Sequence, residues 1–86
     1  MSYSIIIKKQ AKKKLQSLSQ QERVRIVEKI EYLRLDPEHP NLDIKKLAGS
    51  NFFRLRVGDW RIIFDKQEEV RVIAIEKIDA RGGVYK

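Results

Sequence analysis

The chain has 86 residues, of which 42% are hydrophobic and 36% charged, and its 19 Lys and Arg against 12 Asp and Glu give a formal net charge of +7. A chain this short forms one domain, residues 1–86, and its composition excludes a disordered protein. The absence of cysteine excludes a disulfide framework and a thiolate metal site. No apolar run is long enough to cross a membrane, so we expect no membrane association and a cytoplasmic location.

The excess of positive charge favours a polyanionic partner, and nucleic acid is the usual one for a small basic protein. A surface charge that only keeps the protein in solution would produce the same composition. The positions of the cations along the chain must therefore decide between these two interpretations.

The N-terminal part of the chain predicts a strand followed by a helix. Residues 3–7 end in three isoleucines and are expected to form a strand, which places Tyr3, Ile5 and Ile7 on one face. From residue 9 to residue 18 the apolar residues instead recur at helical spacing. The positions expected to be buried in this helix are Ala11, Leu15 and Leu18.

A second helix is predicted directly after the first. Ser19 and Glu22 have the spacing of a capping box, which starts a helix, and Pro37 and Pro40 end it. Residues 42–50 then form a connector that leads into the C-terminal half. The predicted apolar stripe of this second helix consists of Val24, Val27, Ile30 and Leu33, and the connector has anchors at Leu42, Ile44 and Leu47.

The segment from Phe53 to Phe64 predicts a β-hairpin, because two alternating stretches are joined by the two-residue turn Gly58–Asp59. With these two residues as the loop, the apolar side chains pair across the strands on one face. The expected pairs are Val57 with Trp60, Leu55 with Ile62, and Phe53 with Phe64.

The same register places Arg56 directly opposite Arg61 on the other face, with Arg54 one step along the strand. Like charges opposite each other destabilise a sheet, so we predict that an anion lies between these arginines. A hairpin selected for stability alone would avoid this pair.

A third strand is predicted after a loop at residues 66–69. Counting back from this loop places Ile73 opposite Ile62 and Ala74 opposite Arg61. The small side chain of Ala74 would leave open space beside the arginine pair.

The element order predicts an α+β domain: an N-terminal strand, two consecutive helices packed on one face of a mainly antiparallel sheet, and a three-stranded meander that completes the sheet. The opposite sheet face carries Arg54, Arg56 and Arg61 and is expected to stay open to a partner. Each arginine taken singly is best explained as ordinary solvated surface, but the three together, with the cross-strand repulsion, favour a phosphate site.

The sequence contains few residues suited to classical catalysis. It lacks a Cys nucleophile, a phosphate-cradling P-loop and any metal-ligand spacing, so we expect no metal and no cofactor. The three strand arginines, together with Arg81 and Tyr85 in the tail, are suited to binding RNA. Guanidinium groups bind phosphate bidentately and keep their charge, and an aromatic ring stacks on an unpaired base. RNA also supplies its own nucleophile, the 2′-hydroxyl.

Three segments resemble the RelE/ParE superfamily of bacterial toxins, and its RelE branch most of all. They are the lead-in Lys46–Gly49, the hairpin Phe53–Phe64 with its R-x-R-x-G-D-W-R pattern, and the ending Arg81–Tyr85 with its R-x-x-V-Y pattern. Each segment alone is weak evidence. Their order and the span of nearly the whole chain make the resemblance specific.

The resemblance implies a RelE-like fold and the toxin of a type II toxin–antitoxin system. Its activity would be that of a metal-independent, ribosome-dependent endoribonuclease that cleaves mRNA by attack of the 2′-hydroxyl on the adjacent phosphate. The implied partners are an acidic antitoxin in a hetero-oligomer, the ribosome with its 16S rRNA, and the message.

The resemblance also implies roles for individual residues. Arg54 would assist activation of the 2′-hydroxyl, Arg61 would neutralise the scissile phosphate, and Arg81 would stabilise the leaving oxygen. Tyr85 would stack on the message. The further residues expected to contact RNA are Arg56, Lys45, Lys46, Lys12 and Lys13.

Two alternatives remain open from the sequence. One is a ParE-like protein that poisons DNA gyrase by binding it, although the arginine trio and the terminal tyrosine favour the nuclease. The other is a relative without catalytic activity that only binds RNA or its partner. For Lys12 and Lys13, a solvated helix face is as good an interpretation as contact with ribosomal RNA.

Overall fold

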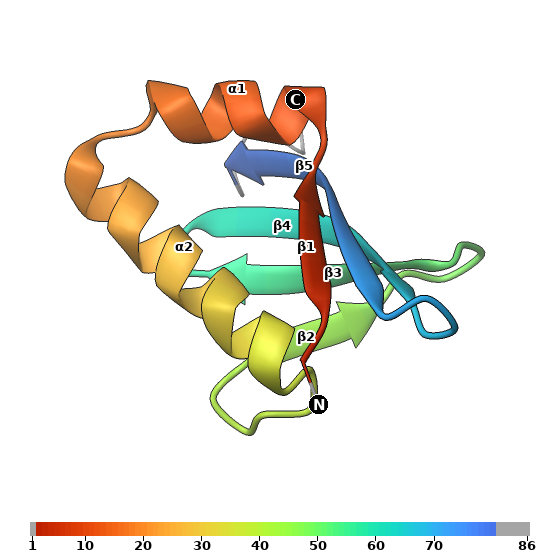
Figure 1. Cartoon of the computed structure of the whole chain (residues 1–86). Coiled ribbons are helices and arrows are strands. Elements are labelled where there is room, and N and C mark those ends of the chain that lie inside the picture. The colour runs from red at the N-terminus through yellow and green to blue at the C-terminus, as the bar shows by residue number, and fades with distance from the viewer. Residues whose placement is uncertain (1, 81–86) are drawn as a thin grey trace.

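A five-stranded sheet with the strand order β1-β5-β4-β3-β2 carries two helices on one face (Figure 1). The structure, a computed structural model, describes residues 2–80. Its elements are β1 (Ser4–Ile7), α1 (Lys9–Ser17), α2 (Gln20–Leu35), β2 (Asp43–Lys46), β3 (Phe52–Val57), β4 (Trp60–Gln67) and β5 (Val72–Ala80). The α+β class and the packing of both helices on one face of a mainly antiparallel sheet are confirmed.

The break between the two helices lies at the predicted capping residue. The Ser19 hydroxyl accepts a hydrogen bond from the backbone N–H of Glu22 at 3.3 Å, which satisfies one of the free donors at the start of α2. In α1, Ala11 and Leu15 are buried as expected. The Ser19 cap therefore marks where α2 begins, while the Glu22 carboxylate of the predicted capping box instead accepts a hydrogen bond from Trp60.

The buried face of α2 differs from the prediction. Ile30 and Leu33 are buried as expected, but Val24 and Val27 are 54% and 47% exposed, and Ile26 takes their place in the core. A constant spacing of three residues drifts by about 60° per step on a helix with 3.6 residues per turn, so Val24 and Leu33 lie on opposite faces. Ile30 follows Ile26 by four residues and Leu33 follows Ile30 by three, so these three side chains lie on one face of the helix.

The predicted connector at residues 42–50 contains a strand. Residues 43–46 form β2, which pairs antiparallel with β3 and places Ile44 beside Leu55. Ile44 packs against the core while its neighbours Asp43 and Lys45 point away from it, which is the alternation of an edge strand. The sheet therefore has one more strand than the sequence predicted.

The hairpin of β3 and β4 has the predicted register. Val57 pairs with Trp60, Leu55 with Ile62, and Phe53 with Phe64, whose rings stack with centroids 5.4 Å apart. Gly58 adopts a φ of +59°, the left-handed conformation that a two-residue hairpin loop with glycine first requires. The turn therefore sets the register of every residue in the hairpin.

The pairing of β4 with β5 differs from the prediction, which placed Ile73 opposite Ile62 and Ala74 opposite Arg61. Ile62 instead pairs with Ile78, and Arg61 pairs with Asp79. Two causes combine: β4 continues to Gln67, so the turn comes later than assumed, and a β-bulge between Ile63 and Phe64 shifts the register.

The N-terminal strand enters the sheet beside β5, as its one parallel neighbour. Tyr3, just before β1, is buried, and its hydroxyl donates a 2.8 Å hydrogen bond to Glu68 Oε1 in the β4–β5 turn. The guanidinium of Arg71 lies 4.3 Å from the centroid of the Tyr3 ring. These contacts tie the start of the chain to a turn more than sixty residues away.

The exposed and buried positions of α2 predict opposite outcomes for two alanine substitutions. Ile26→Ala should lower the free energy of unfolding by about 2–5 kcal/mol, because it removes apolar volume from a fully buried site. Val24→Ala, at an exposed site, should change it by no more than about 0.5 kcal/mol. Urea denaturation followed by circular dichroism measures both, and a large loss in Val24→Ala would contradict this helix face.

The Tyr3–Glu68 hydrogen bond predicts a pH dependence of stability. It raises the pKa of Tyr3 above its ordinary 10.0 and lowers the pKa of Glu68 below its ordinary 4.5. The stabilisation from Glu68 is therefore present above pH 4.5 and lost as the pH falls, and that from Tyr3 is present below pH 10.0 and lost as the pH rises.

Tyr3→Phe should accordingly destabilise the protein most between pH 4.5 and pH 10.0. Below and above this range, the difference in stability between the variant and wild type should become smaller. Denaturation midpoints measured from acid to alkaline pH test this. Tyr32→Phe, at an exposed tyrosine, is the control. A difference that stays constant across the whole range would refute the coupling.

Candidate nucleic-acid interface

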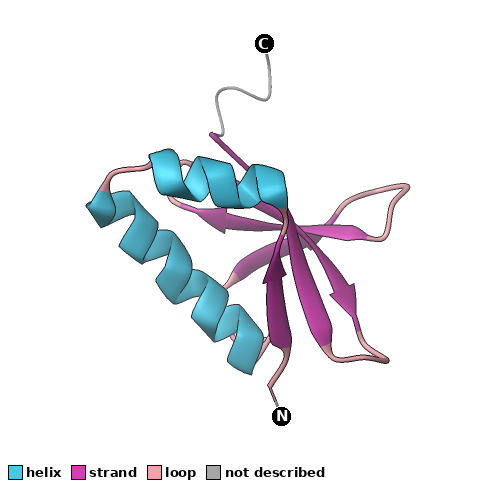
Figure 2. Ribbon diagram, turned by 45° about the horizontal axis from the view of Figure 1, so that its top comes forward, coloured by secondary structure: helices cyan, strands magenta, loops and turns pink. Residues whose placement is uncertain are grey.

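The three predicted arginines share the sheet face that the helices leave uncovered (Figure 2). Arg54 and Arg56 alternate along β3 with buried Leu55 and Val57, so their side chains lie on the opposite face. Arg61 faces the same side from β4, and Lys45 of β2 is the direct neighbour of Arg54. We call these four cations, Lys45, Arg54, Arg56 and Arg61, the arginine face.

A row of four charged residues crosses the arginine face from strand to strand. Arg56 pairs with Arg61, as predicted, but Asp43 of β2 pairs with Arg56 on one side and Asp79 of β5 pairs with Arg61 on the other. A carboxylate thus lies at each end of the row, and the anion expected between the two arginines stays a prediction. The sheet itself offsets the cross-strand repulsion, which does not by itself require a bound ligand.

Asp43 contacts two arginines at once. Its Oδ1 accepts a hydrogen bond from Arg54 Nη2 at 3.2 Å, and its Oδ2 lies 3.7 Å from Arg56 Nε. The Arg54 side chain is only 13% exposed, and its buried Nε has no hydrogen-bond partner among the described residues. A buried donor without a partner lowers stability, and an acceptor oxygen of a bound anion would satisfy it.

The hairpin that carries the arginines is anchored to the helices next to its turn. Trp60 Nε1 donates a 2.7 Å hydrogen bond to Glu22 Oε2 in the first turn of α2, and Lys14 Nζ lies 5.6 Å from the centroid of the Trp60 ring. On the same side, Arg25 lies so close to Gly58 that a Cβ at this glycine would approach Arg25 Nη2 to 2.8 Å. Residues of both helices therefore hold the end of the hairpin in place.

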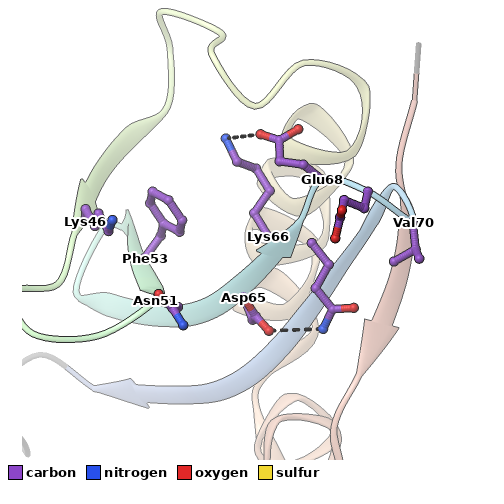
Figure 3. Close-up of a pocket in the computed structure, with 9 residues that line it drawn as sticks. Lys46, Asn51, Phe53, Asp65, Lys66, Glu68 and Val70 are labelled. Atoms are coloured by element: carbon purple, nitrogen blue, oxygen red, sulfur yellow. Dashed lines mark hydrogen bonds and ion pairs between the residues drawn. The ribbon is translucent and has the colours of Figure 1, made fainter.

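Lys46, predicted to contact RNA, is not on the arginine face. It pairs with Phe53, whose ring packs against the core, and so lies on the side of the sheet that carries the helices. With Phe53 and Lys66 it lines a pocket of about 640 Å³ near the β4–β5 turn (Figure 3). Lys66 is paired there with Glu68 at 3.3 Å. Sequence neighbours on a strand point to opposite faces, which separates Lys46 from Lys45.

The remaining predicted residues fall into two groups. Lys12 and Lys13 are exposed on α1, in the helical layer, so the structure does not bring them together with the arginines. Arg81 and Tyr85 lie outside the described residues. The predicted site is therefore assembled here from Lys45, Arg54, Arg56 and Arg61.

Sequence reasoning missed the two aspartates of the row. The alternation of Asp43, Ile44 and Lys45 is the signal that could have revealed β2, and with it Asp43. For Asp79, the signal is the spacing of the buried isoleucines of β5, which changes from two residues (73 to 75) to three (75 to 78). Such a change within a strand indicates a bulge.

The part of the chain that the structure describes holds no group of three acidic or histidine side chains able to bind a metal ion. In the same part, no helix is both long and apolar enough to span a membrane.

Fold and site together define a small basic α+β protein with an arginine-lined sheet face. Residues 5–85 match the family of the ParE toxin of the parDE type II toxin–antitoxin system. The chain is also 34% identical, over 88 aligned positions covering 100% of this chain and 98% of the relative, to a candidate toxin named RelE1 in Methanocaldococcus jannaschii. The chain therefore belongs to the RelE/ParE superfamily and is a RelE-like toxin of a type II toxin–antitoxin system.

Solved structures agree with this membership. The archaeal RelE–RelB complex of Pyrococcus horikoshii OT3 matches with a TM-score of 0.83 and 35% identity over 95% of this chain and 98% of that one. The RelB–RelE complex from Methanococcus jannaschii matches with a TM-score of 0.75 and 27% identity, covering 94% and 95%. The isolated E. coli RelE toxin, at 18% identity and a TM-score of 0.77 over 98% and 92%, shares the fold.

The anchor at Trp60 can be tested by stability measurements. Trp60→Phe removes the donor to the Glu22 carboxylate and should lower the free energy of unfolding by about 1.5–3 kcal/mol, since hydrogen bonds to charged groups fall in this range. Glu22→Gln keeps an acceptor and should cost less. In the double variant the two losses should not add, because both remove the same contact. Additive losses would show that the anchor does not couple these residues.

Proposed function

We propose that this protein is a ribosome-dependent endoribonuclease that cleaves mRNA and so inhibits translation. The observation that carries the proposal is the gathering of Lys45, Arg54, Arg56 and Arg61 on the sheet face without helices. Membership of the superfamily and 34% identity to RelE1 support the same activity. A concave or flat sheet face with several guanidiniums binds a phosphodiester backbone without reading its sequence.

In the proposed reaction the 2′-hydroxyl of one nucleotide attacks the phosphorus of the adjacent phosphodiester. A bond forms from O2′ to phosphorus and the bond from phosphorus to O5′ breaks, which leaves a cyclic phosphate and a free 5′-hydroxyl. The proton lost by O2′ balances the one gained by O5′. The nucleophile belongs to the RNA, so the protein need only position the reactants and stabilise charge.

The arginines would act through their charge. Guanidinium groups hardly ever deprotonate, so Arg54 would favour the developing oxyanion of O2′ electrostatically, and Arg61 would neutralise the added charge on the phosphate. Arg56 would hold the neighbouring backbone. In the tail, we assign Arg81 to the leaving oxygen and Tyr85 to stacking on the message. Dependence on the ribosome follows if the decoding site supplies the strained RNA geometry that the toxin does not.

The partners follow from the charge and from the relatives. The P. horikoshii relative was solved as a complex with RelB, and we propose that this chain likewise forms a hetero-oligomer with an antitoxin, which would be acidic to match the net charge of +7. Lys12 and Lys13, exposed on α1, would contact 16S rRNA in the ribosome-bound state, together with Lys46.

One observation favours a second candidate function. The family whose model matches carries the ParE description, and ParE-like toxins are the group that we associated with DNA gyrase from the sequence. Inhibition of supercoiling by purified gyrase, without any RNA cleavage, would favour this function over the nuclease.

Substitution of the arginines tests the nuclease directly. With purified protein, ribosomes and a translated message, primer extension should detect cuts only during translation. Arg61→Ala and Arg81→Ala should each reduce the cleavage rate about 100-fold or more, because each removes a charge that stabilises the transition state. Both variants should still bind the antitoxin. Arg34→Ala, which removes an exposed α2 arginine paired with Glu31, is the matched control and should cleave normally. Wild-type cleavage by Arg61→Ala would refute the assigned site.

A further inference from the structure

The arginine face carries an anion of its own. We infer that Asp43 is a displaceable internal counterion, which occupies the position of an RNA phosphate between Arg54 and Arg56 and is expelled when RNA binds. The inference rests on the proposed function, since it assigns a role within the same RNA-binding face. It makes Asp43 a residue that determines which anionic ligands the face accepts.

The geometry of the Asp43 carboxylate resembles that of a bound phosphodiester. Each of its oxygens faces a different arginine, Oδ1 towards Arg54 Nη2 at 3.2 Å and Oδ2 towards Arg56 Nε at 3.7 Å. The two non-bridging oxygens of a phosphodiester can address two guanidiniums in the same way, because arginine binds carboxylate and phosphate with one donor pattern. Both anions therefore compete for the same donors.

The side chains of Arg54, Arg56 and Asp43 differ in how much of their surface is exposed. Arg54 is 13% exposed and packed in place, whereas Arg56 is 43% and Asp43 55% exposed. Asp43 is also the first residue of β2, the outer strand of the sheet, so a neighbouring strand flanks it on one side only (Figure 1). Arg54 can thus stay in place while the carboxylate leaves.

Asp79, at the other end of the row, is in a different situation. Its Oδ2 lies 3.3 Å from Nζ of Lys77, a cation of its own strand. In the described part of the chain, the cationic groups within 4.0 Å of the Asp43 carboxylate are Arg54 and Arg56, both predicted to contact RNA. Asp43 therefore competes directly with the substrate for these two arginines.

Competition of this kind selects among ligands. Asp43 is the exposed side of its ion pair with Arg54, and its pair with Arg56 is exposed on both sides. Pairs that are open to solvent stabilise the fold little, so a ligand held through several contacts, such as a message fixed on the ribosome, displaces Asp43 easily. A free RNA strand makes fewer simultaneous contacts with the protein. Repulsion between its phosphates and the Asp43 carboxylate is therefore not offset by other contacts. Asp43 would thus lower the affinity for free RNA and strengthen the dependence on the ribosome.

The test compares Asp43→Asn with wild type in binding a fluorescein-labelled 2′-O-methyl hexanucleotide, which the enzyme cannot cleave. Fluorescence anisotropy at low salt should show about threefold to tenfold tighter binding by Asp43→Asn, because the competing anion is gone. Asp43→Ser should bind more tightly as well. Agreement of the two variants shows that the effect comes from the loss of the carboxylate and not from the asparagine amide. Glu69→Gln makes the same change in net charge at the exposed β4–β5 turn and should change the affinity less than about twofold.

The possible outcomes separate this inference from the proposed function. If wild type binds the RNA and Arg54→Ala does not, while Asp43→Asn binds equally or more weakly, Asp43 positions the arginines and the counterion role is refuted. If neither wild type nor the Asp43 variants bind, the RNA-binding face itself is refuted. In ribosome-dependent cleavage, Asp43→Asn should lower KM and keep kcat. A lower kcat with unchanged thermal stability would also overturn the inference.

Discussion

The two-residue turn at Gly58–Asp59 is the constraint on which the rest of this structure depends. A two-residue loop allows one register, and glycine at its first position provides the left-handed backbone that the loop needs. Since side chains alternate along a strand, a slip by one residue would turn one strand of the hairpin over relative to the other. If β3 turned over, Leu55 would face solvent, and Arg54 and Arg56 would be buried under the helices.

The register of the hairpin consequently fixes both the core and the arginine face. Burial of Leu55, Val57 and Ile62 against Ile26, Ile30 and Leu33 holds the helices on one face, and the arginines are forced onto the other. The contact of Trp60 with Glu22 adds a polar tie between the hairpin and α2. Because the helices and the arginines are on opposite sides, contacts with an RNA backbone need not disturb the packing of the core.

The charge row from Asp43 to Asp79 shows how a sheet can accommodate a cluster of cations. Two arginines opposite each other are unfavourable, but a carboxylate beside each one makes the row neutral overall. This arrangement retains the guanidiniums without a large loss of stability.

The sequence by itself determined the features that depend on neighbours along the chain. The Ser19 cap, the two helices, the hairpin register and the opposition of Arg56 and Arg61 all follow from local turn chemistry and alternation, and all are present in the structure. The features that only the tertiary structure decided depend on contacts between distant segments. They include the pairing of β1 with β5, the addition of β2 to the edge, and the bulge that brings Asp79 beside Arg61. A short edge strand and a single extra residue change local patterns little, yet each alters which side chains meet, because strand pairing is set by the fit of whole elements and not by adjacent residues.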